Sequence, residues 1–280
     1  MHLLLLFSIR YEIYSSLDTT TSNLKFEFNA TASTKKATIS ALTPGTTYYF
    51  RIKPFTKAGG TLGDAAQART FESAPEGVPA PKVAPYNATA VVVTIYPPKA
   101  PNGVITKYVL VQDGVETMEM SNPPSKNGYV ISGLMPYSKH TFQVKVCTEK
   151  GCGYSDVVTS FTRHGIPQGS IVLSVTGIES RSINASWTAI ATPNGPITYR
   201  VLMKGEFYSQ PGVNYDTVNT TVECYSGGIT HAQYICMGLL PKAVYYVRVN
   251  GSNDVGFVLS NQVKVLTKPD GNFLLVKLIR

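Results

Sequence analysis

A block that occurs three times in the chain constrains the fold more than any other feature. It begins with Leu-x-Pro, continues after three residues with alternating aromatic or β-branched positions, and spans 42–52, 134–144 and 239–249. Consecutive copies begin about 100 residues apart, which is the length of a small β module. The alternation is that of a half-buried strand. The chain therefore divides into tandem modules that share one fold.

A second block supports the same division. Residues 95–108 match residues 187–199, and both stretches contain the tripeptide Pro-Asn-Gly. Breaks rich in Pro and Gly at 74–79 and 164–169 mark the linkers between modules. We therefore expect a partial module at 1–72, complete modules at 77–164 and 167–268, and a linker or the start of a further module at 269–280.

Short segments rich in β-branched and aromatic residues fill each module. Examples are 90–95, 109–112, 141–147 and 246–250, each close to Gly, Pro or Asn residues. No window shows the apolar period of 3.6 residues that an amphipathic helix requires. Strands at this spacing without intervening helices predict an all-β fold in which each module is an antiparallel sandwich.

The repeated blocks resemble those of a known family. The 42–52 block and its copies are similar to the corner and the following strand of a fibronectin type III domain, and Trp187 is similar to that family's second-strand tryptophan. The resemblance implies immunoglobulin-like sandwiches in which the first aromatic residue of the block packs into the core and bonds to the corner. His140 stands where the other copies have Tyr, and Ile95 stands where the third module has Trp. The core residues implied in this way are Tyr48, His140, Tyr245, Trp187 and Ile95.

The first module is incomplete by the same comparison. Residues 11–14 match residues 108–111, which the resemblance places in the third strand, yet only ten residues precede them. We expect its first two strands to be missing because of a fragment or truncated gene model. The alternative is that residues 1–9 are a signal segment, although their apolar run is short and no small-x-small cleavage pattern follows.

The four cysteines form two close pairs and leave none over. Cys147 and Cys152 lie in a Cys-Thr-x-x-Gly-Cys sequence that is similar to the hairpin signature of usherin-like fibronectin repeats, with receptor tyrosine phosphatase ectodomains as the second resemblance. Aligned with the other modules, the two cysteines face each other at the mouth of a hairpin, which predicts a disulfide. A second disulfide is expected between Cys224 and Cys236 in the third module.

Paired cysteines suit an oxidising compartment, and N-glycosylation sequons agree with it. The asparagines of the sequons are Asn29, Asn87, Asn184, Asn219 and Asn250. We therefore expect a glycoprotein that is extracellular or forms the ectodomain of a cell-surface protein. The longest apolar run, 3–7, is far shorter than the ~20 residues of a membrane-spanning helix, so no span is expected within this chain.

The net charge of +8 and the pI of about 9.2 permit attraction to polyanions. The 25 Lys and Arg residues are scattered along the sequence without the basic run that marks a nucleic-acid arm. We therefore favour a solvated basic surface over a dedicated polyanion site, keep acidic glycans as a candidate partner, and expect no nucleic-acid partner.

No constellation of catalytic or metal-ligating residues is visible in the sequence. The four histidines lie far apart, the acidic residues are dispersed, and the glycines at 59–63 lack the Lys-Ser/Thr of a phosphate loop. Cys147 and Cys152 could in principle hold a metal, but no second pair at zinc-finger spacing accompanies them, which favours the disulfide. We expect neither an enzyme nor a cofactor.

The candidate contacts with a partner lie at a loop tip and at outward strand positions. They are Glu149 and Lys150 in the predicted disulfide hairpin, and Tyr49 and Tyr246, which alternate with core-facing tyrosines. The sequence thus favours a non-catalytic adhesion or spacer array that binds other extracellular or cell-surface proteins. The alternatives are the ectodomain of a receptor tyrosine phosphatase or kinase, spacer modules of a secreted glycan-degrading enzyme, and a cytosolic muscle-type array, which the cysteines and sequons oppose.

Overall fold

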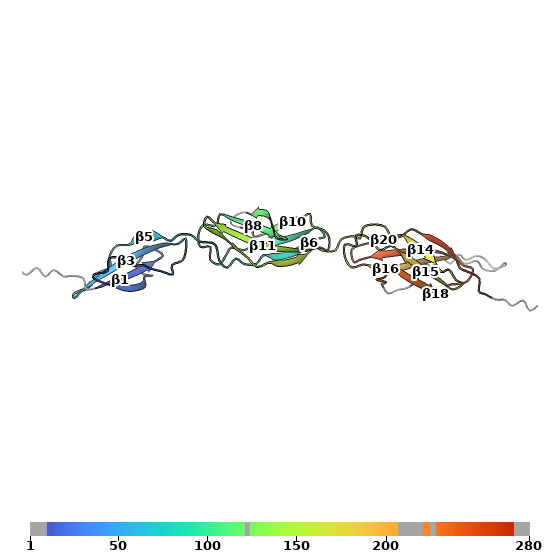
Figure 1. Cartoon of the computed structure of the whole chain (residues 1–280), viewed down its shortest axis with the longest axis horizontal. Coiled ribbons are helices and arrows are strands. Elements are labelled where there is room, and N and C mark those ends of the chain that lie inside the picture. Colours follow the sequence, from blue (N-terminus) through green and yellow to red (C-terminus); the bar gives the residue numbers. More distant parts are fainter. Residues whose placement is uncertain (1–9, 121–123, 207–220, 225–227, 272–280) are drawn as a thin grey trace, which may run out of the picture. The chain divides into compact units, whose positions relative to one another are not determined.

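The computed structural model describes residues 10–120, 124–206, 221–224 and 228–271 (Figure 1). Strands β1 to β21 account for the regular structure of these residues, and none of them is helical. The strands form five sheets. We refer to residues 10–72 as the first module, 73–164 as the middle module and 165–271 as the third module. The predicted all-β fold is confirmed.

The first module contains one five-stranded sheet among its described residues. The order is β2-β1-β3-β4, with β5 paired to β3. The strands are β1 (Arg10–Ser16), β2 (Lys25–Thr31), β3 (Thr47–Thr56), β4 (Gly59–Gly60) and β5 (Ala66–Arg69). Ile52 in β3 is 52% exposed, whereas Val144 and Val249 at the equivalent repeat positions are 1% and 0% exposed. One face of this sheet is therefore less covered than the same face in the other modules.

The middle module is a sandwich of a three-stranded and a five-stranded sheet. The first has the order β10-β7-β6, and the second has the order β12-β11-β8-β9 with β13 paired to β11. Their strands are β6 (Lys82–Asn87), β7 (Ala90–Thr94), β8 (Lys107–Gln112), β9 (Val115–Met120), β10 (Tyr129–Ser132), β11 (Lys139–Thr148), β12 (Gly151–Tyr154) and β13 (Val158–Phe161). Ile95, at the tryptophan position, is 4% exposed. Each sheet buries the β-branched side chains of one face.

The third module repeats this arrangement with sheets β14-β15-β18 and β17-β16-β19-β20, the latter extended by β21 on β19. The strands are β14 (Leu173–Thr176), β15 (Ser182–Trp187), β16 (Thr198–Glu206), β17 (Thr221–Glu223), β18 (Gln233–Met237), β19 (Val244–Ser252), β20 (Phe257–Leu259) and β21 (Val263–Leu266). Trp187 is 6% exposed, and its ring centroid lies 5.5 Å from that of Tyr199. The Cys224–Cys236 disulfide joins the residue after β17 to fully buried Cys236 in β18.

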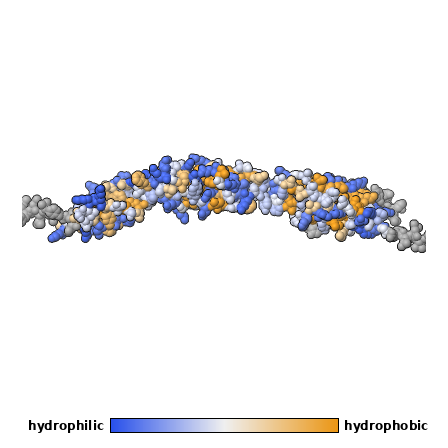
Figure 2. All heavy atoms as spheres, in the orientation of Figure 1, coloured by the Kyte–Doolittle hydropathy of each residue, from blue (hydrophilic) through white to orange (hydrophobic). Residues whose placement is uncertain are grey.

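The repeated Leu-x-Pro block forms the same corner in the first and third modules. The backbone N–H groups of Thr43 and Leu240 donate to the hydroxyls of Tyr48 and Tyr245, each at 2.9 Å. Both tyrosine rings are buried, so these residues lock the corner to the core. Figure 2 shows polar and apolar residues interspersed over the visible surface of the described residues.

His140 behaves differently from the tyrosines at the equivalent position. Its side chain is only partly buried, and its Nδ1 lies 2.7 Å from an Asp113 carboxylate oxygen in the turn between β8 and β9. Burial raises the pKa of Asp113, but hydrogen bonds from His140 and from the Thr141 backbone N–H outweigh it and hold the pKa below its ordinary value. The imidazole thus contacts the turn between β8 and β9 at the module surface.

Candidate interaction surface at the disulfide hairpin

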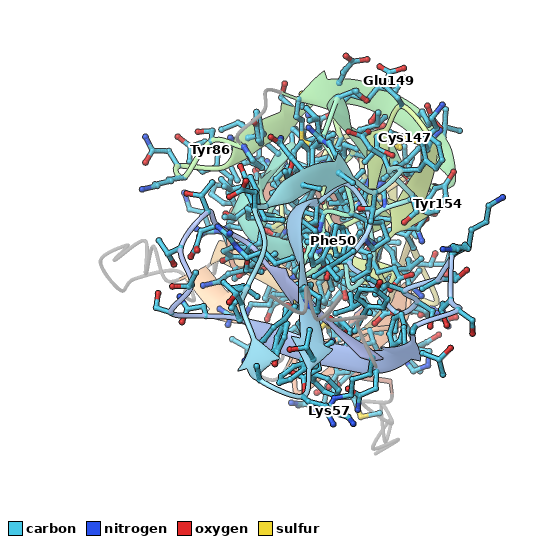
Figure 3. The ribbon with its side chains drawn as sticks, turned by 90° about the vertical axis from the view of Figure 1, so that its left-hand side faces the viewer. Phe50, Lys57, Tyr86, Cys147, Glu149 and Tyr154 are labelled. Atoms are coloured by element: carbon cyan, nitrogen blue, oxygen red, sulfur yellow. A yellow bond between two sulfur atoms is a disulfide. The ribbon has the colours of Figure 1, made fainter. Side chains whose placement is uncertain are left out.

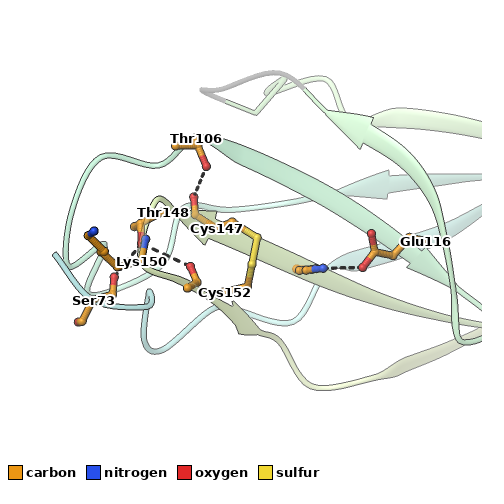
Figure 4. Close-up of a disulfide and its surroundings, with 9 residues drawn as sticks. Ser73, Thr106, Glu116, Cys147, Thr148, Lys150 and Cys152 are labelled. Atoms are coloured by element: carbon orange, nitrogen blue, oxygen red, sulfur yellow. Dashed lines mark hydrogen bonds and ion pairs between the residues drawn. A yellow bond between two sulfur atoms is a disulfide. The ribbon is translucent and has the colours of Figure 1, made fainter.

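Strands β11 and β12 form a hairpin that the Cys147–Cys152 disulfide closes (Figure 4). The two cysteines pair directly across the hairpin with Cα atoms 4.1 Å apart. Thr148 pairs with Gly151, which leaves a two-residue turn. Within the turn, the Lys150 backbone N–H donates to the Thr148 hydroxyl at 3.2 Å. The disulfide and this local bond together restrict the conformation of the tip.

The strand ends that flank the turn are held against the segment that opens the middle module. The Thr148 hydroxyl donates to the Ser73 carbonyl oxygen at 2.9 Å. At Gly153, a Cβ atom would lie only 2.1 Å from the Pro75 carbonyl oxygen. A side chain at this position would therefore displace the segment, and glycine is what allows the two backbones to approach.

The two turn residues, Glu149 and Lys150, are both exposed, and Figure 3 shows Glu149 pointing outward beyond Cys147. Beside the tip on the same sheet, Lys145 Nζ donates to a Glu116 carboxylate oxygen at 2.6 Å. This bond lowers the pKa of Glu116. The tip thus presents one acidic and one basic side chain on a rigid base.

Asn102, from the repeated Pro-Asn-Gly tripeptide, fixes the same opening segment. Its Nδ2 donates to the Ala74 carbonyl oxygen at 3.0 Å, and its own carbonyl oxygen accepts the Ser73 N–H at 3.0 Å. The residue is 7% exposed and has a φ of 54°. Asn tolerates this left-handed conformation better than most residues. The sequence repeat revealed the tripeptide but not this role, because the bonded segment lies far upstream.

Asn194 does the same in the third module. Its Nδ2 donates to the Ile166 carbonyl oxygen at 2.8 Å, and its carbonyl oxygen accepts the Gly165 N–H at 2.9 Å. Asn253, in the turn between β19 and β20, adds a bond from its Nδ2 to the Gly165 carbonyl oxygen at 2.8 Å. In both complete modules, a Pro-Asn-Gly loop and a neighbouring hairpin therefore hold the opening segment.

The four candidate contact residues lie in three different modules. Tyr49 is in β3 of the first module, and Tyr246 is in β19 of the third; both are half-buried. Lys264 Nζ lies 5.5 Å from the centre of the Tyr246 ring. Of the four, only Glu149 and Lys150 lie together, in the turn between β11 and β12.

The sequon asparagines differ in accessibility. Asn29 and Asn87 are exposed, whereas Asn184 and Asn250 are half-buried within strands. In the Asn87 sequon, Asn87 Oδ1 accepts the Thr89 backbone N–H at 2.8 Å. Asn219 lies outside the described residues. Exposure thus favours Asn29 and Asn87 as acceptors of a glycan.

The described part of the chain holds no group of three or more His, Cys, Asp or Glu side chains placed to bind a metal ion. It also contains no helix of the length and hydropathy needed to cross a membrane.

Comparisons with known proteins agree with the repeat. A model of the Fibronectin type III domain matches residues 73–161 and 167–265. Human usherin is 34% identical to this chain over 93% of the chain, and the match spans 5% of the length of usherin. Human phosphatidylinositol phosphatase PTPRQ is 25% identical over 83% of the chain, and the match spans 12% of the length of PTPRQ. Human neogenin is 33% identical over 58% of the chain and 12% of its own length.

Among solved structures, the FN1–FN3 domains of chicken CNTN1 match 92% of this chain and 90% of their own length. The sequence identity is 18% and the TM-score is 0.43. The resemblance to usherin-like and receptor phosphatase repeats is confirmed by the matches to usherin and PTPRQ. Because the two stretches matched by the domain model make up most of the sequence, the chain belongs to the fibronectin type III family.

Proposed function

We propose that this chain is part of a non-catalytic extracellular adhesion or spacer array that binds other extracellular or cell-surface proteins. The observation that carries the proposal is a disulfide in each complete module, Cys147–Cys152 and Cys224–Cys236. Disulfides persist in oxidising compartments and are rare in the cytosol. Repeats of this family are typical of extracellular adhesion and receptor proteins, and neogenin is among the relatives.

The way the opening segments are held supports the spacer role. Asn102 and Asn194 each bond to both a carbonyl oxygen and an N–H of the segment that opens their own module. A short segment whose backbone is fixed by hydrogen bonds transmits force and position better than a flexible linker does. Both modules use the same tripeptide for this purpose, which is what an array of repeated spacers requires.

The hairpin tip is the contact surface that we propose within the array. Glu149 and Lys150 are exposed, and the disulfide restricts the turn that carries them. A rigid loop loses less conformational entropy on binding than a mobile one, so the same contacts give a higher affinity. Tyr49 and Tyr246 remain further candidate contacts, with acidic glycans as a second class of partner.

A receptor ectodomain is the alternative, and the similarity to PTPRQ favours it. In that case the same array would stand outside a membrane and a catalytic domain would follow it in the chain. The sequence of the full-length transcript distinguishes the two, since it shows whether a membrane-spanning helix and a phosphatase domain follow.

Secretion from a eukaryotic cell line tests the extracellular assignment. We expect N-glycans on several sequons, with the exposed Asn29 and Asn87 modified first. An amidase that removes N-glycans should then lower the apparent mass, and an Asn29→Gln, Asn87→Gln variant should lose most of that change. A secreted chain whose mass the amidase leaves unchanged would contradict the assignment.

A further inference from the structure

The outer face of the five-stranded sheet in the third module gathers positive charge. Backbone pairing places Lys204 opposite Tyr246, Tyr246 opposite Lys264, and Leu202 opposite Arg248. Directly paired residues point to the same face, so these side chains are neighbours. The exposed cations of this basic face are Arg200, Lys204, Arg248 and Lys264.

Two of these cations, Lys204 and Arg248, line a shallow groove of about 310 Å³. The other residues that line it are Leu202, Met203, Tyr246, Leu259 and Gln262. Neighbouring strands lie about 4.8 Å apart, so the cations on β16, β19 and β21 spread over about 10 Å across the sheet. This is an extended surface rather than a deep pocket for a small molecule.

The charges of Lys204, Arg248 and Lys264 are available to a ligand. Among the side chains that the structure describes, no carboxylate lies within ion-pair distance of these three. Two acidic residues lie near these positions along the backbone: Glu206 follows Lys204 by two residues in β16, and Glu223 in edge strand β17 pairs with Leu202.

The same face in the other modules carries a different pattern of charge. In the middle module, Lys145 is bonded to Glu116 at 2.6 Å. In the first module, Arg51 occupies the position equivalent to Arg248, and its guanidinium donates to backbone oxygens of Gly63 and Thr19. These cations are engaged within their own modules.

We propose that the basic face of the third module binds a linear acidic glycan, a polysaccharide that carries sulfate or carboxylate groups. Cations spaced over a shallow groove match anionic groups repeated along an extended chain, and each contact is a charge-assisted hydrogen bond. Arg248 can hold a sulfate or carboxylate through two N–H groups, and the lysines act as point charges beside it. This inference rests on the proposed extracellular function, because acidic polysaccharides of this kind are found outside the cell.

Asn250 lies on the same face, since it pairs with Arg200. A glycan on this sequon would cover part of the groove. Enzymatic removal of the glycan would leave an Asp at this position and add a negative charge beside the cations. The test therefore uses the full chain in an Asn250→Gln background, secreted and purified with its disulfides intact.

The probe is a heparin-derived octasaccharide immobilised on a sensor surface. We expect the triple variant Lys204→Gln, Arg248→Gln, Lys264→Gln to weaken binding at least about tenfold. A matched control, Lys82→Gln, Lys126→Gln, Lys139→Gln, changes the net charge equally at exposed positions of the middle module. It should reduce binding less than about twofold. The single Arg248→Gln variant should give an intermediate loss.

Several outcomes would overturn the proposal. They are unchanged binding by a triple variant whose near-ultraviolet circular dichroism is native, an equal loss in the control, equal binding of an octasaccharide that is both desulfated and carboxyl-reduced, and binding to phosphatidylserine vesicles without binding to the octasaccharide. If the triple variant does not fold, the octasaccharide affinity of the single Arg248→Gln variant decides between the proposal and its rejection. None of these results depends on glycosylation during secretion, so failure here leaves the extracellular assignment separately testable.

Discussion

Two substitutions of Asn194 distinguish the stability that its side-chain hydrogen bond contributes from the stability cost of its left-handed backbone conformation. The residue is 9% exposed, its Nδ2 donates to the Ile166 carbonyl oxygen at 2.8 Å, and its φ is 51°. Asn194→Gly removes the hydrogen bond while tolerating the left-handed conformation. Asn194→Ala removes the same bond and must also hold an alanine at a positive φ, which L-residues resist.

The free energies of unfolding of the two variants should therefore differ by the cost of holding alanine in the left-handed conformation. A lost hydrogen bond of this kind costs about 1 kcal/mol of the free energy of unfolding. Holding Ala in the left-handed region adds roughly 1 kcal/mol. We expect Asn194→Gly to destabilise the third module by about 1 kcal/mol and Asn194→Ala by about 2 kcal/mol.

Tryptophan fluorescence in urea measures this directly. The chain has one Trp, and Trp187 is buried in the third module, so its fluorescence follows the unfolding of that module. With a urea dependence of about 1 kcal/mol per molar, the midpoint should fall by about 1 M for Gly and about 2 M for Ala. The control is Asn102→Ala in the middle module, which should leave the Trp transition in place. Equal midpoints for the two Asn194 variants would refute the conformational argument, and unchanged midpoints would refute both contributions.

Three further outcomes test other parts of the structure. Replacing Cys147 and Cys152 by Ser should lower the stability of the middle module by about 2 kcal/mol in denaturant unfolding, leave it folded, and weaken any binding through the hairpin tip; unchanged affinity of the folded variant would remove the tip as a contact site. Burial raises the Asp113 pKa, but the hydrogen bonds with His140 and the Thr141 backbone N–H outweigh it, so the stabilising effect of these bonds is present above about pH 4 and is lost as the pH falls through the lowered pKa. Asp113→Asn should flatten the pH dependence of unfolding below that value, and an unaltered profile would contradict the role of these bonds. Because Ile52 is 52% exposed where its equivalents are buried, limited proteolysis should cut the first module before the third, and equal resistance would argue against an incomplete core.

Local sequence patterns predicted the strands and the hairpin disulfide well. Alternation of apolar and polar residues requires only neighbouring positions, and it appears directly in the buried Val247 and Val249 beside exposed Arg248. Cys147 and Cys152 are five residues apart in the sequence, so one hairpin register fixes their geometry. Where the relevant contact is local, the sequence pattern was sufficient.

Contacts between distant segments could not be read in the same way. The Asn102 side chain bonds to Ala74, and the His140 ring bonds to Asp113, and neither partner is adjacent in the sequence. The basic face was also missed, because Lys204, Arg248 and Lys264 come from three strands and form a patch only after the strands pair. Basic residues that are scattered along the sequence can thus be gathered in the fold.

Peptide mapping under non-reducing conditions tests the extracellular assignment most directly. The sample is the chain secreted from eukaryotic cells, alkylated before digestion so that free thiols cannot exchange. We expect one linked peptide pair that contains Cys147 and Cys152 and a second that contains Cys224 and Cys236, each separating on reduction. Alkylated free thiols at all four positions in the folded, secreted protein would contradict the assignment.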